Sequence, residues 1–172
     1  MTPTSRYLTS EEIERRAFAL LEKHRVRKPP IDIDAIALEE GLTFELTTFS
    51  VASGAYIGLG DGHGRALISR DESQVRQRYS KAHELAHHLI DRQHETWQLA
   101  PSFRGRDRHG PHEKFAAYLL MPRGWMVATV EHALQNGRSG AELVERVSRV
   151  FNVSRQAAVV RLRELGYEDA IG

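Results

Sequence analysis

Cysteine is absent from the 172-residue sequence, so the chain can form neither disulfide bonds nor metal sites with thiolate ligands. No apolar run approaches the roughly 18 residues that would be needed to span a bilayer. The N-terminal segment, MTPTSRYLTSEEIERRA, lacks the apolar stretch of a secretory signal. These absences predict a soluble protein, for which a cytoplasmic location is the simplest interpretation.

An excess of charge of one sign is also lacking, because 24 lysine and arginine residues are balanced by 23 aspartate and glutamate residues. The net charge of +1 argues against a protein whose main role is to coat nucleic acid. Arg104, Arg106 and Arg108 form a local basic cluster, which would suit only a small DNA-contacting surface. The length fits one domain, with at most a small appendage.

The first half of the chain predicts two helices followed by a small sheet. A helical pattern starts at Thr9 or Ser10 and stops at Pro29-Pro30, and a short second helix starts at about Asp32 or Asp34 and is closed by Gly41. Between residues 43 and 69 the β-prone runs TFELTTF, GAYIGLG and RALISR predict three strands. The helical period returns over residues 73–92, and the segment ETWQLAPSFRGRDRHGP after it is predicted to be a loop.

The second half is predicted to be helical. Pro111 suits the first position of the helix PHEKFAAYLL, and a further helix is expected near residues 125–135. Two more helices follow, joined by a turn near Asn152, with Ser154 as the N-cap of the second. We expect an α+β fold with a main domain over residues 1–125 and a helix-turn-helix-like extension over residues 126–172 packed on it.

A candidate metal site lies in the segment KAHELAHHLIDRQ. His83 and His87 are four residues apart, about 400° around a helix, so both imidazoles project from one side and could share Zn²⁺, with Mn²⁺ as a second candidate. Glu84 follows the first histidine and could reach a metal-bound water without being a ligand itself, which is the HExxH arrangement with the glutamate as general base. His88 lies about 140° from His83 around the helix and is not expected to be a ligand. We expect the following histidines at the surface: His24, His63, His94 and His132.

The segment YSKAHELAHHLI, followed about two dozen residues later by FAAYLLMP, resembles the ImmA/IrrE family of small cytosolic bacterial and phage metallopeptidases. The segments PIDIDAIALEEGLTFE, SGAYIG and FNVSRQAAVVRLRELG are similar to further parts of that family, so the resemblance covers most of residues 10–166. It implies a minimal zincin-like domain with N-terminal helices, a three-stranded sheet, the HExxH helix and a C-terminal helical pair. It also implies cleavage of a helix-turn-helix repressor or antitoxin, which would derepress stress or mobile-element genes.

The third metal ligand is where the sequence departs from the family. The family has a ligand Glu six residues before the Phe of FAAxLLMP and an Asn or Asp two residues before it, and here these positions hold His109 and Glu113. In one interpretation His109 is the ligand and Glu113 orients an imidazole. In the other the helix is one turn shorter and Glu113 is the ligand, which is the choice we favour, with His112 as a third candidate. Zn²⁺ binds His and Glu equally well, so chemistry leaves these alternatives open.

If the site holds zinc, the metal would lower the pKa of a bound water from 15.7 to about 7, and Glu84 would take its proton and return it to the leaving amine. The substrate would lie extended along a sheet edge, for which GAYIGLG is the candidate.

Other functions are a DNA-binding regulator, in which Arg155, Arg161 and Arg163 meet phosphates, and a partner-binding protein that keeps the fold without proteolysis. We expect no membrane partner. The near-neutral charge makes the nucleic-acid role of the C-terminal helices the weaker alternative.

Overall fold

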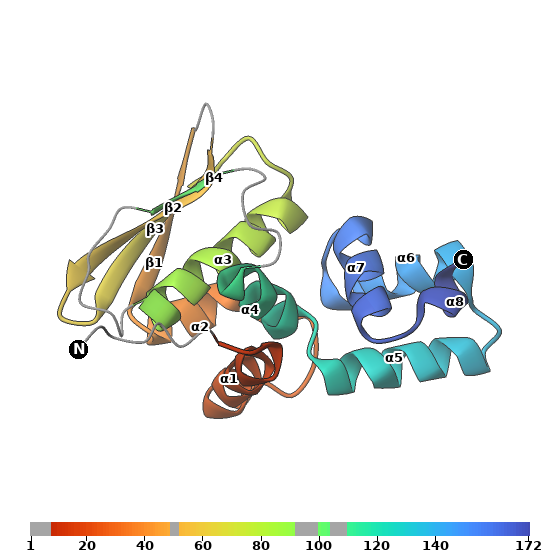
Figure 1. The fold of residues 1–172 in the computed structure, drawn as a ribbon. Helices are drawn as coiled ribbons and strands as arrows, with labels where there is room; N and C mark the ends of the chain where they lie inside the picture. Colours follow the sequence, from red (N-terminus) through yellow and green to blue (C-terminus); the bar gives the residue numbers. More distant parts are fainter. Residues whose placement is uncertain (1–7, 49–51, 92–99, 104–109) are drawn as a thin grey trace.

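The computed structural model describes residues 8–48, 52–91, 100–103 and 110–172, and Figure 1 shows its fold. In chain order the elements are α1 (Ser10–Lys23), α2 (Ile33–Glu39), β1 (Leu42–Thr47), β2 (Ala52–Gly60), β3 (His63–Ser69), α3 (Gln74–Asp91), β4 (Ala100–Phe103), α4 (Pro111–Leu120), α5 (Arg123–Gln135), α6 (Gly140–Phe151), α7 (Arg155–Glu164) and α8 (Glu168–Ile171). The sheet lies at one end of the molecule with α3 across one face, and α5 to α8 form the other end (Figure 1). The α+β fold with a small mixed sheet is therefore confirmed.

The sheet has the strand order β1-β3-β2-β4 among the described residues. β1 pairs with β3 in parallel, and β2 pairs antiparallel with both β3 and β4. The three predicted strands are present, but the prediction of a loop is wrong for Ala100–Phe103, which forms β4. Four residues that include a proline carry little local strand signal, and β4 exists because it pairs with β2, where Gly54 lies opposite Ser102.

The ends of α1 and α2 are held by side-chain hydrogen bonds. Thr9 and Glu12 form a reciprocal capping box at the start of α1. His24, predicted at the surface, has a side chain that is only 5% exposed, and its two ring nitrogens lie 2.9 Å from Glu39 and 2.6 Å from Glu40. The surface prediction was wrong for His24 because the C-terminal end of α1 packs against the acidic end of α2. His63 and His132 are exposed, as predicted, and His94 lies outside the described residues.

The C-terminal helices follow the predicted pattern of caps. Asn152 ends α6 in the left-handed conformation at φ 51°, and the side chain of Ser154 accepts a hydrogen bond from the backbone of Ala157 at the start of α7. α5 runs through position 125, where the sequence places the boundary between the main domain and the extension. None of the helices in the described residues is long and apolar enough to cross a membrane.

Arg161 of α7 joins the C-terminal helices to the rest of the molecule. It is 2% exposed, and its guanidinium donates to the carbonyl of Met121 at 3.2 Å and to Glu14 of α1 at 2.6 Å. The guanidinium also lies 4.1 Å from the ring centre of Tyr118. In the DNA-binding alternative Arg161 would meet phosphates, but its buried guanidinium is already paired with the carboxylates of Glu14 and Glu164, so it is not available to them.

Candidate metal and catalytic site

Helix α3 carries the candidate site because it is covered on two sides. It packs against the strands on one side and against α4 on the other (Figure 1). Small and apolar residues at helical spacing, such as Ala82, Leu85 and Ala86, make this close packing, and each is fully buried. Polar side chains between them are therefore also shielded from solvent, which requires each to find a partner or a ligand.

His83 and His87 face each other through one nitrogen each. Their Nε2 atoms lie 3.2 Å apart, and their side chains are 14% and 11% exposed. A tetrahedral zinc ion with bonds of 2.0–2.1 Å would hold two nitrogen ligands roughly 3.3 Å apart. Burial, together with the nearby His87 and His112, lowers the pKa of His83 to about 3, so this imidazole is neutral, as a metal ligand must be. The pair therefore fits a metal ion.

Glu84 lies next to this pair and points toward the sheet. Its side chain is buried, and a methyl group added at Gly54 of β2 would come within 2.6 Å of its Oε1 atom. The close approach explains why a glycine stands in the SGAYIG segment, since a side chain there would displace the carboxylate. The sequence marked this strand, but only the packing of α3 on β2 reveals that Gly54 makes room for Glu84.

Glu113, in the first turn of α4, lies beside His83. Its Oε1 atom is 3.4 Å from Nδ1 of His83, and its Oε2 atom accepts a hydrogen bond from the hydroxyl of Tyr79 at 2.8 Å. Among the described residues, Nδ1 of His83 makes no hydrogen bond. Burial and the carboxylate of Glu113 raise the pKa of Tyr79, which keeps its hydroxyl protonated as a donor. Sequence reasoning missed Tyr79, although it lies one helical turn before His83.

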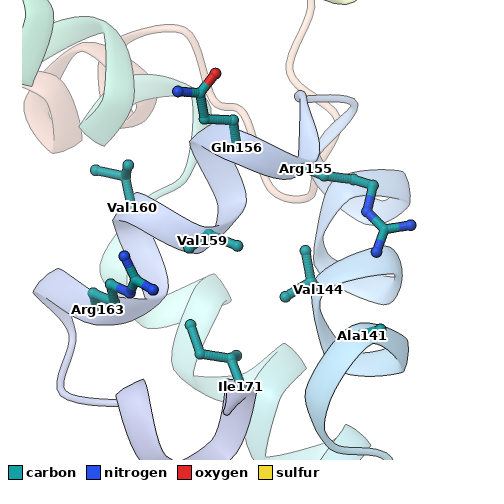
Figure 2. Close-up of a pocket in the computed structure, with 8 residues that line it drawn as sticks. All are labelled: Ala141, Val144, Arg155, Gln156, Val159, Val160, Arg163 and Ile171. Carbon is teal, nitrogen blue, oxygen red and sulfur yellow. The ribbon is translucent and has the colours of Figure 1, made fainter.

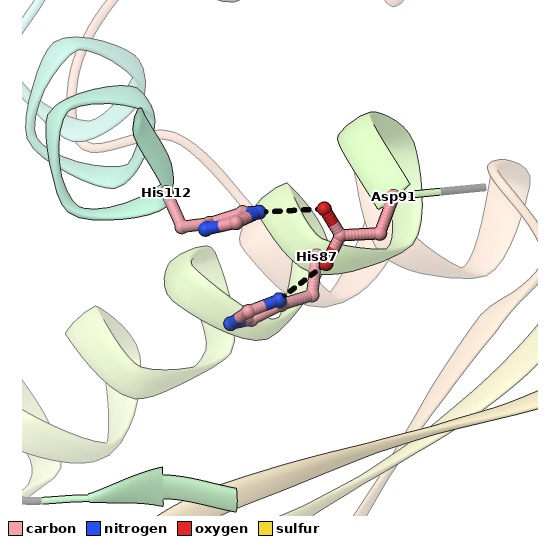
Figure 3. Close-up of side chains that lie close together, drawn as sticks. All are labelled: His87, Asp91 and His112. Carbon is pink, nitrogen blue, oxygen red and sulfur yellow. Dashed lines mark hydrogen bonds and ion pairs between the residues drawn. The ribbon is translucent and has the colours of Figure 1, made fainter. Parts of the chain in front are cut away.

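His112 and Asp91 meet beside His87 (Figure 3). Asp91 accepts hydrogen bonds from Nδ1 of His87 at 2.7 Å and from Nε2 of His112 at 2.8 Å. The rings of His87 and His112 are stacked, with centres 3.9 Å apart and an angle of 18° between their planes. Burial would raise the pKa of Asp91, but the hydrogen bonds from His112 and His87 hold it well below its usual range. Asp91 was not among the predicted residues, although it lies four residues after His87 on the same helix face.

His88 takes no part in the pair. Its Nδ1 atom lies 3.0 Å from the hydroxyl of Tyr56, and its Nε2 atom lies 2.8 Å from the carbonyl of Glu40. The fully buried ring thus joins α3 to the sheet and to the end of α2, in agreement with its predicted exclusion from the ligands. His109, the alternative third ligand, lies outside the described residues.

A groove of about 520 Å³ lies between α6, α7 and α8, on the C-terminal helices (Figure 2). Apolar side chains such as Val159 and Ile171 line it, and Arg155 and Arg163 add positive charge. It contains none of the candidate catalytic residues.

Comparisons with known proteins give a family match and a similar fold. Residues 41–163 match the profile of the peptidase M78 family, described as the IrrE N-terminal-like domain. No curated protein matches the sequence significantly. A solved structure of a Mycobacterium tuberculosis transcriptional regulator has a similar fold, with a TM-score of 0.62 and 16% identity over 96% of this chain, which spans half (50%) of that longer protein. Because the matched residues are more than half of the chain and include the histidine helix, the protein belongs to the IrrE N-terminal-like family of peptidases.

Proposed function

We propose that this protein is a zinc-dependent endopeptidase in which His83 and His87 bind the metal and Glu84 is the general base. The observation that carries the proposal is the facing pair of Nε2 atoms, 3.2 Å apart, with the buried carboxylate of Glu84 on the next residue of the same helix. Membership of a peptidase family supports the same activity. Zn²⁺ suits two imidazoles and a third nitrogen or oxygen ligand, and Mn²⁺ is the alternative ion.

The metal would supply a Lewis acid that polarises the substrate carbonyl and makes water nucleophilic near neutral pH. The protein's own contribution is to place a base beside that water. Glu84 would hold the proton released by the attacking water on its carboxylate and pass it to the departing amine. Its buried position beside Gly54 shields the carboxylate from bulk water.

Glu113 has two possible roles in this proposal, as the third metal ligand or as a hydrogen-bond acceptor that orients His83. As the predicted third ligand, Glu113 would turn its carboxylate toward the Nε2 pair. In the position observed, 3.4 Å from Nδ1 of His83, it instead suits an acceptor that orients the ring, and the third ligand would then be His109 or His112. Elemental analysis of the separate Glu113→Ala, His109→Ala and His112→Ala variants distinguishes these roles, because only loss of the ligand itself abolishes zinc binding.

The proposed substrate is a helix-turn-helix repressor or antitoxin, bound as an extended segment beside the sheet. β2 was the predicted edge, but between Gly54 and Tyr56 it is paired with both β3 and β4, so that part of it cannot accept another strand. The edge strands of the described sheet are β1 and β4. A substrate that adds to the sheet would therefore pair with an edge strand or with β2 beyond Tyr56.

The alternative function is a DNA-binding or partner-binding regulator that keeps the fold without proteolysis. The observation that favours it is the exposed position of Arg155 and Arg163 on α7, where both line the groove of the C-terminal helices (Figure 2), although Arg155 also pairs with Glu145 at 3.4 Å. With Arg161 buried, this surface offers less positive charge than the sequence suggests.

The test is to compare zinc content and cleavage in the wild type, Glu84→Gln and His83→Ala. The assay substrates are candidate helix-turn-helix regulators, taken first from the products of flanking genes, and their cleavage is monitored by gel electrophoresis and mass spectrometry. We expect about one zinc per chain in the wild type and in Glu84→Gln, cleavage only in the wild type, and loss of zinc in His83→Ala. Wild-type protein without zinc after the metal is supplied would refute the proposal. Zinc binding with cleavage undiminished in Glu84→Gln would refute the role of Glu84.

A further inference from the structure

Asp91 is the last residue of α3, and each of its carboxylate oxygens accepts a hydrogen bond from a different imidazole. Oδ2 lies 2.7 Å from Nδ1 of His87, and Oδ1 lies 2.8 Å from Nε2 of His112 (Figure 3). One side chain therefore fixes a ring on its own helix and a ring on α4.

These contacts determine which nitrogen of His87 carries the hydrogen. An ionised carboxylate only accepts hydrogen bonds, so Nδ1 of His87 must be the donor. A neutral imidazole has one N–H, which leaves the lone pair on Nε2. That Nε2 atom is the one 3.2 Å from Nε2 of His83, so Asp91 points the lone pair of His87 toward the position of a shared metal.

The two imidazoles also position each other. The ring of His112 stacks on that of His87 at 3.9 Å between centres, which prevents His87 from rotating out of the plane that its hydrogen bond favours. Gly110, the N-cap of α4, has no side chain to cap the helix. The start of α4 is therefore held partly by the contact of His112 with Asp91, and this ties the region of the candidate third ligands to the end of α3.

Hydrogen bonds and ring stacking account for the close approach of these three side chains. Their potential ligand atoms lie within 4.8 Å of one another, a spacing that would also suit a cation. Nδ1 of His87 and Nε2 of His112, however, each face a different oxygen of Asp91 at hydrogen-bond distance, so both contacts with the carboxylate already join a donor to an acceptor. A separate metal ion would have to displace both hydrogen bonds.

The carboxylate of Asp91 contacts His87 differently from the way the carboxylate of Glu113 contacts His83. Glu113 lies 3.4 Å from Nδ1 of His83 without a hydrogen bond, whereas Asp91 makes a short hydrogen bond to Nδ1 of His87. We propose that Asp91 is a positioning residue that selects the tautomer of His87 and couples it to His112, and that zinc affinity depends on it. This inference rests on the proposed function, because it assigns Asp91 a role only through His87.

The first readout needs no metal. In metal-free, ¹⁵N-labelled protein, long-range proton–nitrogen spectra distinguish the two imidazole tautomers. We expect His87 of the wild type to carry its hydrogen on Nδ1, and Asp91→Ala to lose that preference at His87. A role confined to helix stability would leave the tautomer unchanged, because the rings would keep their other contacts.

The second readout is zinc affinity, measured by competition with a chelator. Loss of a carboxylate that orients a ligand histidine typically weakens metal binding about 10- to 100-fold, and we expect that range for Asp91→Ala. Asp91→Asn keeps one carbonyl acceptor and should lose less affinity. Asp34→Asn is the matched control. Asp34 also contacts α3, through an ion pair with Lys81 at 2.6 Å, but this contact involves none of the candidate ligand histidines. Its zinc affinity should equal that of the wild type.

The outcomes separate this inference from the proposed function. A wild type that binds zinc, with Asp91→Ala unchanged in both tautomer and affinity, would overturn the role of Asp91 and leave the metal site standing. A wild type that binds no zinc would overturn both. The Asp91 side chain is 41% exposed, so we expect both variants to fold, and circular dichroism checks this. If Asp91→Ala is misfolded, the isosteric Asp91→Asn decides by zinc affinity, and an affinity equal to that of the wild type would overturn the role of Asp91.

Discussion

Replacement of Arg161 by alanine should destabilise the whole protein, although this residue lies on the last long helix. Its guanidinium is paired with Glu14 of α1 and with Glu164, donates to the carbonyl of Met121, and packs on the ring of Tyr118. The side chain is 3% exposed, so water cannot replace these contacts while the C-terminal helices stay in place.

The expected magnitude follows from the burial of the partners. Removal of one member of a buried ion pair costs about 3–5 kcal/mol when the charge left behind is also buried. Glu14 is 28% exposed and keeps part of its hydration, which places the loss near the lower limit, at about 3 kcal/mol. For a chain of this length, that loss should lower the melting temperature by about 6–12 °C.

The assay is urea unfolding monitored by circular dichroism, with Arg163→Ala as the matched control. Arg163 lies on the same helix and is exposed, so its replacement should change the free energy of unfolding by less than about 0.5 kcal/mol. A loss below about 1 kcal/mol in Arg161→Ala, or equal losses in the two variants, would refute the reasoning. Either result would mean that the C-terminal helices are not held to α1 and α4 by this side chain.

Two further predictions concern Glu84 and Glu40. In Gly54→Ala the added methyl group would lie 2.6 Å from Oε1 of Glu84, so we expect reduced cleavage and a stability loss of about 1–3 kcal/mol by thermal unfolding. Gly124→Ala, with no atom within 4 Å of the added group, should instead be neutral or stabilising by up to about 1 kcal/mol, and equal effects of the two substitutions would contradict this reading. Burial would raise the pKa of Glu40, but its hydrogen bonds with a lysine and a histidine at the end of α1 lower it below the ordinary value of 4.5. Its ionised form therefore stabilises the fold above about pH 4.5, and this contribution disappears as the pH falls through the lowered pKa. Between about pH 5 and pH 3, the free energy of unfolding measured by urea titration should fall less in Glu40→Gln than in the wild type. If it falls equally in both proteins, Glu40 contributes nothing to the pH dependence.

Local sequence determined the helices and much of the candidate site. The capping box at Thr9, the N-cap at Ser154 and the Pro111 start of α4 each depend on residues within one turn, so they could be predicted without knowing the fold. The spacing of His83 and His87 is of the same kind. Once those residues are helical, their imidazoles must lie on one side, and the facing Nε2 atoms follow from that geometry.

Contacts between distant residues decided the rest, and no local pattern contains them. β4 is a strand because β2 offers it hydrogen bonds, and Arg161 is buried because Glu14, 147 residues earlier, accepts its charge. Asp91 lies on α3 with the candidate metal ligands, yet its proposed role depends on His112, which only the packing of α4 on α3 brings beside it. Helical spacing is a property of the chain itself, whereas the partner of a buried charge depends on which elements meet when the chain folds.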